Sequence, residues 1–322
     1  MLRYRVTGGH YSSGVSSTVS VFRACAGGYV GAGHVHPALL DAVREAVAQA
    51  KDASLIADGY VARCGDDIGL VLLHAEPAGS DSIRSLASDA FERAADVGRR
   101  LHQHGVDGRP LDVDGTEITF AVRDSEPVLC FFADKAGAGA WNVHLYRMFG
   151  DPFNTPALVS DAAMSKGFRF YANGVSSGSF DLPDDLYRFL GVAGQSGSCV
   201  RDVRSRATDE VGAVSSGGRD PVLIVRCGSP FPSVEEVLEA FAVPYALGAS
   251  DGGPSPLVPV SANGDASTRS LGRAVGLGFQ VAPDRLIGPR DLLGDAAFDD
   301  ARRQAATAAD YLRRHGPFAP AR

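Results

Sequence analysis

Two apolar segments joined by an acidic turn constrain the fold more than any other part of this chain. Residues 55–63 and 68–74 have the composition of strands, and Cys64-Gly65-Asp66-Asp67 joins them. A Gly-Asp-Asp tip between two apolar strands is typical of a tight β-hairpin. The sequence therefore predicts an antiparallel strand pair with two carboxylates at one end.

The rest of the chain alternates between strand and helix patterns. We expect strands over residues 19–25, 116–123, 127–133, 199–205 and 221–227, and helices over residues 37–51, 82–104, 234–241 and 296–314. The absence of a repeat or linker favours a single α/β domain over residues 18–322. The Gly- and Ser-rich residues 1–17 are expected to be a flexible extension.

Composition excludes several classes of function. The net charge is -7 and aromatic residues make up only 8%, which argues against nucleic-acid partners. The sequence has no apolar run of membrane-spanning length, so we expect no membrane partner. The five cysteines are odd in number and lack C-x-x-C spacing, which is typical of reduced thiols in a cytoplasmic protein.

Carboxylates lie at the ends of three predicted strands. Asp66 and Asp67 form the hairpin tip, Asp134 follows one apolar strand, and Asp220 precedes another. Carboxylates gathered at one sheet edge repel one another unless a cation, a lysine or an arginine lies among them. A hard divalent cation such as Mg²⁺ prefers oxygen ligands and would suit this site. Aspartates that only hydrogen-bond within local turns are the alternative.

Several longer motifs occur in a specific order. They are Cys64-Gly65-Asp66-Asp67, Phe132-Ala133-Asp134-Lys135, Trp141-Asn142, Asp151-Pro152-Phe153-Asn154-Thr155, Leu277-Gly278-Phe279 and Arg313-Arg314-His315-Gly316-Pro317-Phe318. This order resembles the archaeal and bacterial fructose-1,6-bisphosphate aldolase/phosphatase family over about residues 19–322. The resemblance implies a four-layer α-β-β-α sandwich, a homo-octamer, several bound Mg²⁺ ions and a small-molecule phosphorylated substrate. It also implies aldol chemistry through a lysine Schiff base.

The resemblance assigns roles to individual residues. It implies metal ligation by Asp66, Asp67, Asp134 and Asp220, catalytic roles for Asp66, Asp67, Asp134 and Lys135, and substrate contacts from Lys135, Asn142 and Arg269. The first-strand aspartate ligand of the family is replaced by Cys25. Because a thiolate favours softer ions, Cys25 and His34 with one of the hairpin aspartates are an alternative site for Zn²⁺. Mn²⁺, a metal-free protein and simple packing of Cys25 at its strand end also remain open.

Other family positions differ in this chain. The Schiff-base lysine falls on Gly218, the acidic residue before Asp220 becomes Arg219, and a loop histidine falls on Ala32. The loops over residues 103–115 and 215–217 are shortened, and residues 269–272 lose an aspartate. These differences imply that the aldolase mechanism of the family is lost.

Three functions follow from these observations. The first is a metal-assisted enzyme, a hydrolase or lyase acting on a phosphorylated sugar or related metabolite. The second is a non-catalytic relative that acts as a ligand-binding or assembly partner. The third is a metal-free lyase or cyclase of specialised metabolism that uses the remaining acidic and basic groups.

Overall fold

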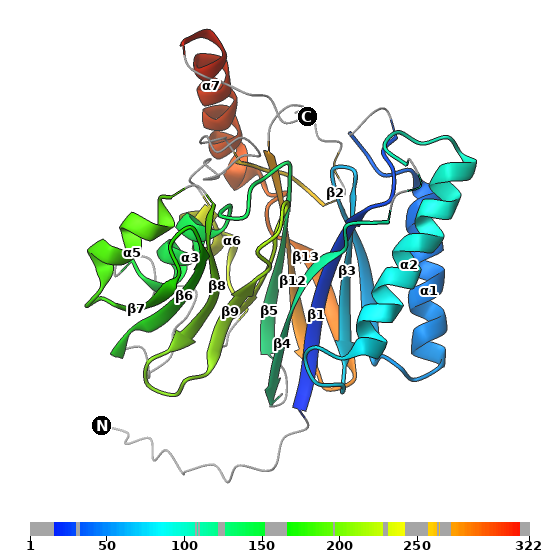
Figure 1. Cartoon of the computed structure of the whole chain (residues 1–322), viewed down its shortest axis with the longest axis horizontal. Coiled ribbons are helices and arrows are strands. Elements are labelled where there is room, and N and C mark those ends of the chain that lie inside the picture. Colours follow the sequence, from blue (N-terminus) through cyan, green and yellow to red (C-terminus); the bar gives the residue numbers. More distant parts are fainter. Residues whose placement is uncertain are drawn as a thin grey trace, which may run out of the picture.

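A computed structural model describes most of the chain as a mixed α/β fold (Figure 1). It describes residues 16–29, 33–106, 108, 110–121, 126–151, 166–195, 197–227, 231–241, 257–262, 264 and 272–315. The described strands form two sheets, in which all pairings but one are antiparallel. No helix in these ranges is long and apolar enough to cross a membrane.

The smaller sheet contains the predicted hairpin. Its four strands are in the order β2-β3-β1-β4, and they are β1 (Ser16–Cys25), β2 (Asp58–Cys64), β3 (Asp67–His74) and β4 (Asp114–Ala121). β2 and β3 pair antiparallel with Cys64 opposite Asp67, so Gly65 and Asp66 form the turn. Gly65 has φ of +65°, a conformation that favours glycine. The hairpin prediction is therefore confirmed.

The larger sheet has nine strands among the described residues. They are β5 (Glu126–Asp134), β6 (Phe168–Gly174), β7 (Gly178–Leu182), β8 (Ser198–Ser205), β9 (Val211–Ser215), β10 (Val222–Arg226), β11 (Leu257–Pro259), β12 (Gly272–Ala282) and β13 (Arg285–Asp291). β5 lies between β12 and β10 and is buried along its whole length, as its continuous apolar sequence predicts.

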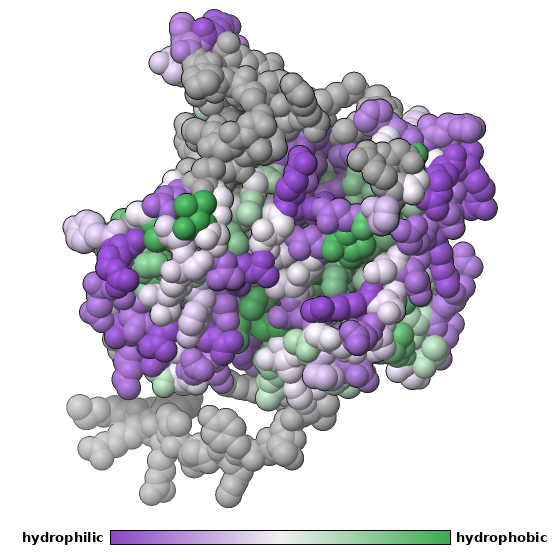
Figure 2. Space-filling model, viewed as in Figure 1, coloured by the Kyte–Doolittle hydropathy of each residue, from purple (hydrophilic) through white to green (hydrophobic). Residues whose placement is uncertain are grey.

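Helices border both sheets (Figure 1). They are α1 (Pro37–Asp52), α2 (Asp81–Arg100), α3 (Asn142–Phe149), α5 (Leu186–Ala193), α6 (Val234–Phe241) and α7 (Asp299–His315), with the 3₁₀ turn η2 (Ala296–Phe298) before α7. α1 and α2 lie side by side, and Figure 2 shows that their outer surface is hydrophilic. Each buries an apolar stripe against the smaller sheet, as amphipathic helices do.

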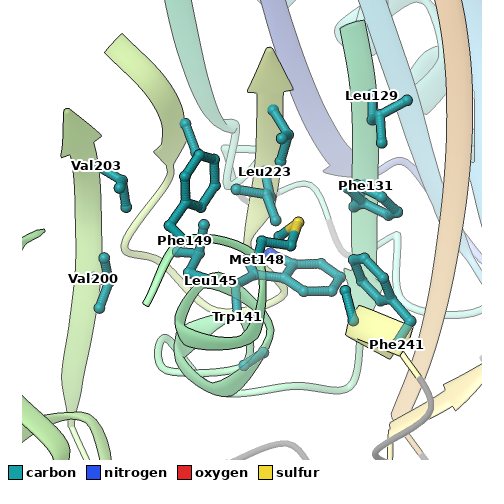
Figure 3. Packing of buried hydrophobic residues seen from close by; sticks show 14 of the residues in the cluster. Leu129, Phe131, Trp141, Leu145, Met148, Phe149, Val200, Val203, Leu223 and Phe241 are labelled. Carbon is teal, nitrogen blue, oxygen red and sulfur yellow. The ribbon is translucent and has the colours of Figure 1, made fainter. Parts of the chain in front are cut away.

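Three main hydrophobic clusters hold these elements together. One joins the smaller sheet to α1 and α2, and a second joins strands of the two sheets. The third joins the larger sheet to α3, α5 and α6. In Figure 3, Leu145 and Met148 of α3, and Trp141 just before this helix, lie against β5 and β10, with Phe131 stacked on Phe241.

Some predicted boundaries are wrong by a few residues. β1 begins at Ser16, so Ser16 and Ser17 belong to the sheet rather than to the expected extension, whose residues 1–15 lie outside the described part. α2 ends at Arg100 rather than at residue 104. His102 and Gly105 both have positive φ, which is incompatible with a continuing helix. Helix 37–51 and helix 234–241 are confirmed almost as predicted.

Candidate functional site

Several charged side chains lie at one end of the space between the two sheets. Alternate residues of a strand share a face, and on β1 and β5 that face contributes Val19, Val21, Cys130 and Phe132 to the cluster between the sheets. Continuing the same alternation to the strand ends reaches Arg23 and Asp67 in the smaller sheet and Asp134 and Arg273 in the larger. All four are buried, with at most 4% of their surface exposed. Asp66 and Asp220 lie beside them. We call the group formed by these six residues the acidic hollow.

Arg23 is the cation of the smaller sheet. Its Nη1 lies 3.3 Å from Asp67 Oδ2 and 4.0 Å from Asp220 Oδ2. Its Nη2 donates to the backbone carbonyl of Arg219 and lies 3.9 Å from Asp112 Oδ2 at the exposed rim. Arg23 therefore links the hairpin to the segment that precedes β10.

Arg273 is the cation of the larger sheet, and it is fully buried. Its Nε donates to Asp134 Oδ2 at 2.6 Å, and its Nη2 contacts the same oxygen. Nη2 also lies 4.0 Å from Asp66 Oδ1, and Nη1 donates to the carbonyl of Gly33 at 3.0 Å. A guanidinium has a fixed fork of donors, which suits this set of acceptors.

The turn residue Gly65 closes the hollow over this ion pair. A Cβ at this position would collide with Asp134 Oδ2 and with Arg273 Nη2. Glycine is therefore required here by space as well as by its positive φ. The hairpin tip lies directly on the charged pair of the larger sheet.

Asp220 joins two loops at the edge of the hollow. Its Oδ1 accepts a hydrogen bond from the backbone N–H of Ala136 at 2.6 Å, and its own N–H donates to the Ala136 carbonyl at 2.9 Å. Asp220 and Lys135 both have positive φ, of 50° and 57°. Non-glycine residues seldom adopt this conformation, and such local strain is typical of functional sites.

Three carboxyl groups in the hollow, those of Asp67, Asp134 and Asp220, have raised pKa values. Burial raises the pKa of Asp134 to about 7, although Arg273 lowers it, and nearby Asp66 and Asp220 raise it further. Burial also raises the pKa of Asp67 and of Asp220, in each case against the lowering effect of Arg23. The two arginines thus offset only part of the cost of gathering these carboxylates. A carboxyl whose pKa lies near neutrality can exchange a proton at physiological pH.

Cys25 and His34 occupy the rim of the hollow. Cys25 Sγ–H donates to Asp66 Oδ2 at 3.5 Å. Burial raises the pKa of this thiol, and Asp67 and Asp66 raise it further. The thiol therefore stays protonated, which disfavours the thiolate that a soft metal needs. His34 pairs through its backbone with Tyr29 and lines a small recess with Gly33 and Gly65.

The arrangement of these donors does not fit a three-ligand cation site. Asp134 Oδ2 is held by Arg273, Asp220 Oδ1 by the Ala136 N–H, and Asp67 Oδ2 by Arg23. In the part of the chain that the structure describes, no group of three or more His, Cys, Asp or Glu side chains is arranged to hold a metal ion. Arginine side chains supply the positive charge for which the sequence suggested Mg²⁺.

The structure describes two of the three residues that were predicted to contact substrate, Asn142 and Lys135. Asn142 is buried, its Nδ2 donates to the carbonyls of Ala193 and Ser198, and its Oδ1 accepts from the N–H of Val200. These backbone partners favour a structural role over the predicted contact with substrate. Arg269 lies outside the described residues. Lys135 remains at the hollow, where its charge lowers the pKa of Asp134.

Gly218, the position to which the resemblance assigns a Schiff-base lysine, lies against a carboxylate. A Cβ on Gly218 would lie 2.7 Å from Asp114 Oδ2, so this carboxylate takes the adjacent space. Asp114 accepts a hydrogen bond from Ser216 Oγ, which in turn accepts from the N–H of Val222 at 3.0 Å. Asp114 is thus fixed by the segment that carries Gly218.

The sequence analysis found the carboxylates but missed the arginines and Asp114. The four predicted aspartates do come together, since Arg23 lies within 4.0 Å of Asp67 and Asp220, and Arg273 lies within 4.0 Å of Asp134 and Asp66. Arg23 lies in a strand that is buried at all but its two end residues, on the same face as Val19 and Val21. A buried arginine in such a pattern implies a carboxylate partner, and this signal could have identified it.

Comparison with known proteins agrees with this architecture. The sequence model of the family described as Fructose-1,6-bisphosphatase matches residues 16–322. A fructose-1,6-bisphosphate aldolase/phosphatase of Moorella thermoacetica is 41% identical, covering 95% of this chain and 88% of the relative. Proteins of the same name from Metallosphaera sedula and Methanothermobacter marburgensis are 38% and 35% identical, covering 95% and 96% of this chain and 88% and 93% of their own. The chain therefore belongs to the fructose-1,6-bisphosphate aldolase/phosphatase family.

Proposed function

We propose that this protein hydrolyses a phosphate ester of a sugar or related polyol in the acidic hollow, and that it does not use the family's Schiff-base aldolase mechanism. The observation that carries the proposal is the convergence of Asp66, Asp67, Asp134 and Asp220 around two buried arginines. Relatives that cover nearly the whole chain are named for action on fructose 1,6-bisphosphate.

The roles follow from the positions of the side chains. Asp134, whose pKa is about 7, is suited to donate a proton to the leaving oxygen. Lys135 is adjacent and offers positive charge to the phosphoryl oxygens, which carry the charge that develops in phosphoryl transfer. Arg23 and Arg273 hold Asp67 and Asp134 in place. Water attacks phosphorus, the ester bond breaks, and inorganic phosphate and the free alcohol are released.

We infer that the aldolase route is lost because the chain has few lysines that could form a Schiff base. The chain contains only Lys51, Lys135 and Lys166. Lys51 lies on α1 and pairs with Asp58 at 2.8 Å, remote from the hollow. Lys135 is the one lysine beside the carboxylates, where it balances Asp134. Because Gly218 provides no amine, a Schiff base would have to form on Lys135.

Phosphate release from a panel of sugar phosphates tests the hydrolase. Wild-type protein should release phosphate, and Asp67→Asn and Asp134→Asn should each lose at least about a hundredfold of that activity. Asp202→Asn, at a carboxylate paired with Arg204 outside the hollow, is the control and should keep it. A wild-type protein that is inert on the panel would reject the proposal. Borohydride trapping with dihydroxyacetone phosphate tests the aldolase route, and a trapped adduct on Lys135 would show that it survives.

The predicted binding of a divalent cation needs a separate test. We propose that Mg²⁺, Mn²⁺ or Zn²⁺ binds weakly if at all, because it would have to displace Arg23 or Arg273 from a carboxylate. Asp66, Asp67, Asp134, Asp220, Cys25 and His34 are the side chains available to such an ion. Metal content after purification, and melting temperature with and without EDTA, measure this directly. A stoichiometric metal would contradict it.

A metal-free lyase is the second candidate. It is favoured by the presence of a carboxyl with a pKa of about 7 beside cationic side chains that can hold an anion. Such an enzyme would consume the sugar phosphate without a matching yield of phosphate, which mass spectrometry of the same reactions would reveal. If the sugar phosphate binds tightly but is not altered, the result would instead favour a non-catalytic protein that acts as a ligand-binding or assembly partner.

Two further properties are proposed from the family. The contacts of the three clusters are consistent with an α-β-β-α arrangement of layers. A homo-octamer is expected in solution, and light scattering after size-exclusion chromatography measures its mass.

A further inference from the structure

A buried polar network lies on the helix-facing side of the smaller sheet, at the end of β3 that is remote from the acidic hollow. β3 begins at Asp67 in the hollow and ends at His74, roughly 20 Å away along the strand. His74 shares a face of β3 with Leu70 and Leu72, which belong to the cluster that joins this sheet to α1 and α2. His74 is 1% exposed, and Ser20 of β1 beside it is fully buried.

The hydrogen-bond partners of His74 fix the position of its proton. Nδ1 lies 3.0 Å from the backbone carbonyl of Glu76, which can only accept, so Nδ1 carries the hydrogen. In the neutral ring Nε2 is therefore an acceptor, and Ser20 Oγ donates to it at 2.7 Å. Thr18 Oγ1 donates to the same carbonyl of Glu76 at 2.7 Å. The loop after β3 is thus held on the sheet through one carbonyl group.

Glu117 of β4 holds the same loop at a second point. Its Oε2 accepts a hydrogen bond from the N–H of Gly79, just before α2 begins. Its Oε1 is buried and has no hydrogen-bond partner among the described residues. Glu117 lies directly opposite Ser20 in the register of β1 and β4. Because a buried acceptor without a donor is costly, a donor that can turn toward Oε1 is favoured.

Protonation of His74 reverses the direction of its hydrogen bond to Ser20. An imidazolium has two N–H donors and no acceptor, so Nε2–H then donates to Ser20 Oγ. The hydroxyl of Ser20 must turn its own hydrogen to another acceptor, and the unpaired Oε1 of Glu117 lies across the register. The negative carboxylate also favours the imidazolium. The only net change is the uptake of one proton from water.

We infer that His74, Ser20 and Glu117 form a pH-sensitive latch that holds the loop over residues 75–80 and the start of α2 on the smaller sheet. When the ring is neutral, Ser20 donates to His74 and Glu117 holds Gly79. In acid, His74 donates to Ser20, Ser20 donates to Glu117, and the carboxylate turns away from Gly79. The loop is then released while the strands stay paired. The latch lies outside the acidic hollow and does not depend on the proposed function.

The acidity of His74 agrees with this direction. Burial lowers the pKa of His74, against the raising effects of Glu117 and Glu76. The closed latch therefore keeps the ring neutral, is most favoured above pH 6.5, and loses stability as the pH falls through this value. The charged groups on the elements around the ring are Glu117 of β4, Glu76 of the loop, Asp81 and Arg84 of α2, and Asp58 of β2. Asp81 and Arg84 are exposed and screened by solvent, and Asp58 is bound by Lys51.

Hydrogen exchange of the full chain, read by mass spectrometry and corrected for the intrinsic effect of pH, tests the latch. In the wild type, protection of residues 75–83 should fall about tenfold from pH 8 to pH 5.5, because pH 5.5 is one unit below the ordinary pKa of histidine. Protection of β6, at the far side of the larger sheet, should change less than about twofold. Equal protection of residues 75–83 at the two pH values would overturn the inference.

Matched variants assign the response to the network. His74→Asn keeps an N–H that can donate to the Glu76 carbonyl but cannot take up the proton, so its protection should no longer depend on pH. His102→Asn is the control, since His102 is exposed and has a positive φ that asparagine tolerates, and it should respond as the wild type does. A pH dependence that persists in His74→Asn, or is lost in His102→Asn, would show that another group is responsible.

Glu117→Gln tests the relay without touching the histidine. Removal of the negative charge makes the imidazolium less favourable, so the response should shift to lower pH and the loss of protection at pH 5.5 should be smaller than in the wild type. Far-UV circular dichroism of each variant checks that the fold is retained. If Glu117→Gln responds at the same pH as the wild type, the relay through Ser20 to Glu117 is wrong.

Discussion

A cavity of about 580 Å³ beside β4, lined by Arg84, Asp114 and Arg201 among others, is here called the β4 cavity. The acidic hollow and the β4 cavity each contain two arginines, but only the arginines of the hollow form ion pairs among the described residues. In the hollow, Arg23 and Arg273 are buried and each contacts carboxylates of the chain. In the cavity, Arg84 is exposed, Arg201 is half-buried, and neither forms an ion pair among the described residues. The first pair is bound to carboxylates of the protein, whereas the second pair is bound to none among the described residues.

The two pairs of arginines should therefore contribute differently to the stability of the fold. A buried ion pair adds little stability compared with apolar residues, but removing one partner leaves a costly unpaired charge. An arginine at a water-filled cavity is already solvated, so its loss costs the fold little. Stability measurements on the two pairs should therefore diverge strongly, and the following predictions run from the largest expected effect to the smallest.

Removal of Arg273 should break the hollow. Arg273→Met leaves Asp134 buried without its counter-ion, and we expect a loss of about 3–5 kcal/mol in the free energy of unfolding. Denaturant titration followed by circular dichroism measures this loss. Arg273→Met combined with Asp134→Asn should recover much of it, because the uncompensated charge is then absent. A double variant as unstable as the single would contradict the charge explanation.

A side chain at the hairpin tip should disturb the same ion pair by contact alone. Gly65→Ala places a Cβ against Asp134 and Arg273 at a positive φ, and we expect a cost of about 2–4 kcal/mol. Gly79→Ala is the matched control, since its φ is +86° and no atom lies within 4 Å of the added Cβ. The control should lose only about 1 kcal/mol. Equal losses would show that the backbone conformation, rather than the ion pair, is responsible.

The pH dependence of stability should reveal Asp134. Its pKa in the folded protein is about 7, above the ordinary value of 3.8, so the folded state keeps a proton that the unfolded chain releases. This group's contribution is therefore fully present below about pH 4 and is lost as the pH rises to about 7. Relative to wild type, Asp134→Asn should become progressively more stable over this range. Unfolding midpoints from pH 4 to pH 8 in EDTA measure the difference, and parallel profiles would exclude a raised pKa.

The cavity arginines should show the smallest effect. Arg84→Gln and Arg201→Gln should each change the free energy of unfolding by less than about 0.5 kcal/mol in the absence of ligand. The same denaturant titration applies. A loss of several kcal/mol would mean that these arginines serve the fold, and the contrast with the hollow would fail.

The fold and the carboxylates were accessible from the sequence because both follow from local patterns. The Gly65 turn, the buried strand before Asp134 and the helix after Pro37 are each encoded by neighbouring residues. Convergence of the aspartates follows from their place at strand ends. These features need no knowledge of which strands are adjacent.

The arginines and the cavity depend on pairings between distant segments. Arg273 meets Asp134 because β12 lies beside β5, and Arg23 meets Asp67 because β1 pairs with β3. Arg201 reaches the cavity from β8, and Arg84 reaches it from α2. No local pattern specifies these contacts. The sequence therefore predicted a cation beside these carboxylates without showing the two arginines, and it predicted a substrate contact for Asn142 without showing the backbone partners of its amide.

The position of β4 at the margin of its sheet has a consequence for handling the protein. Among the described strands, β4 pairs only with β1, and the margin of a sheet can invite another chain to add a strand. Asp114 and Glu117 put negative charge along this margin, which discourages such polymerisation. Neutralising both acids would therefore promote precipitation, and solubility would need to be monitored in any such variant.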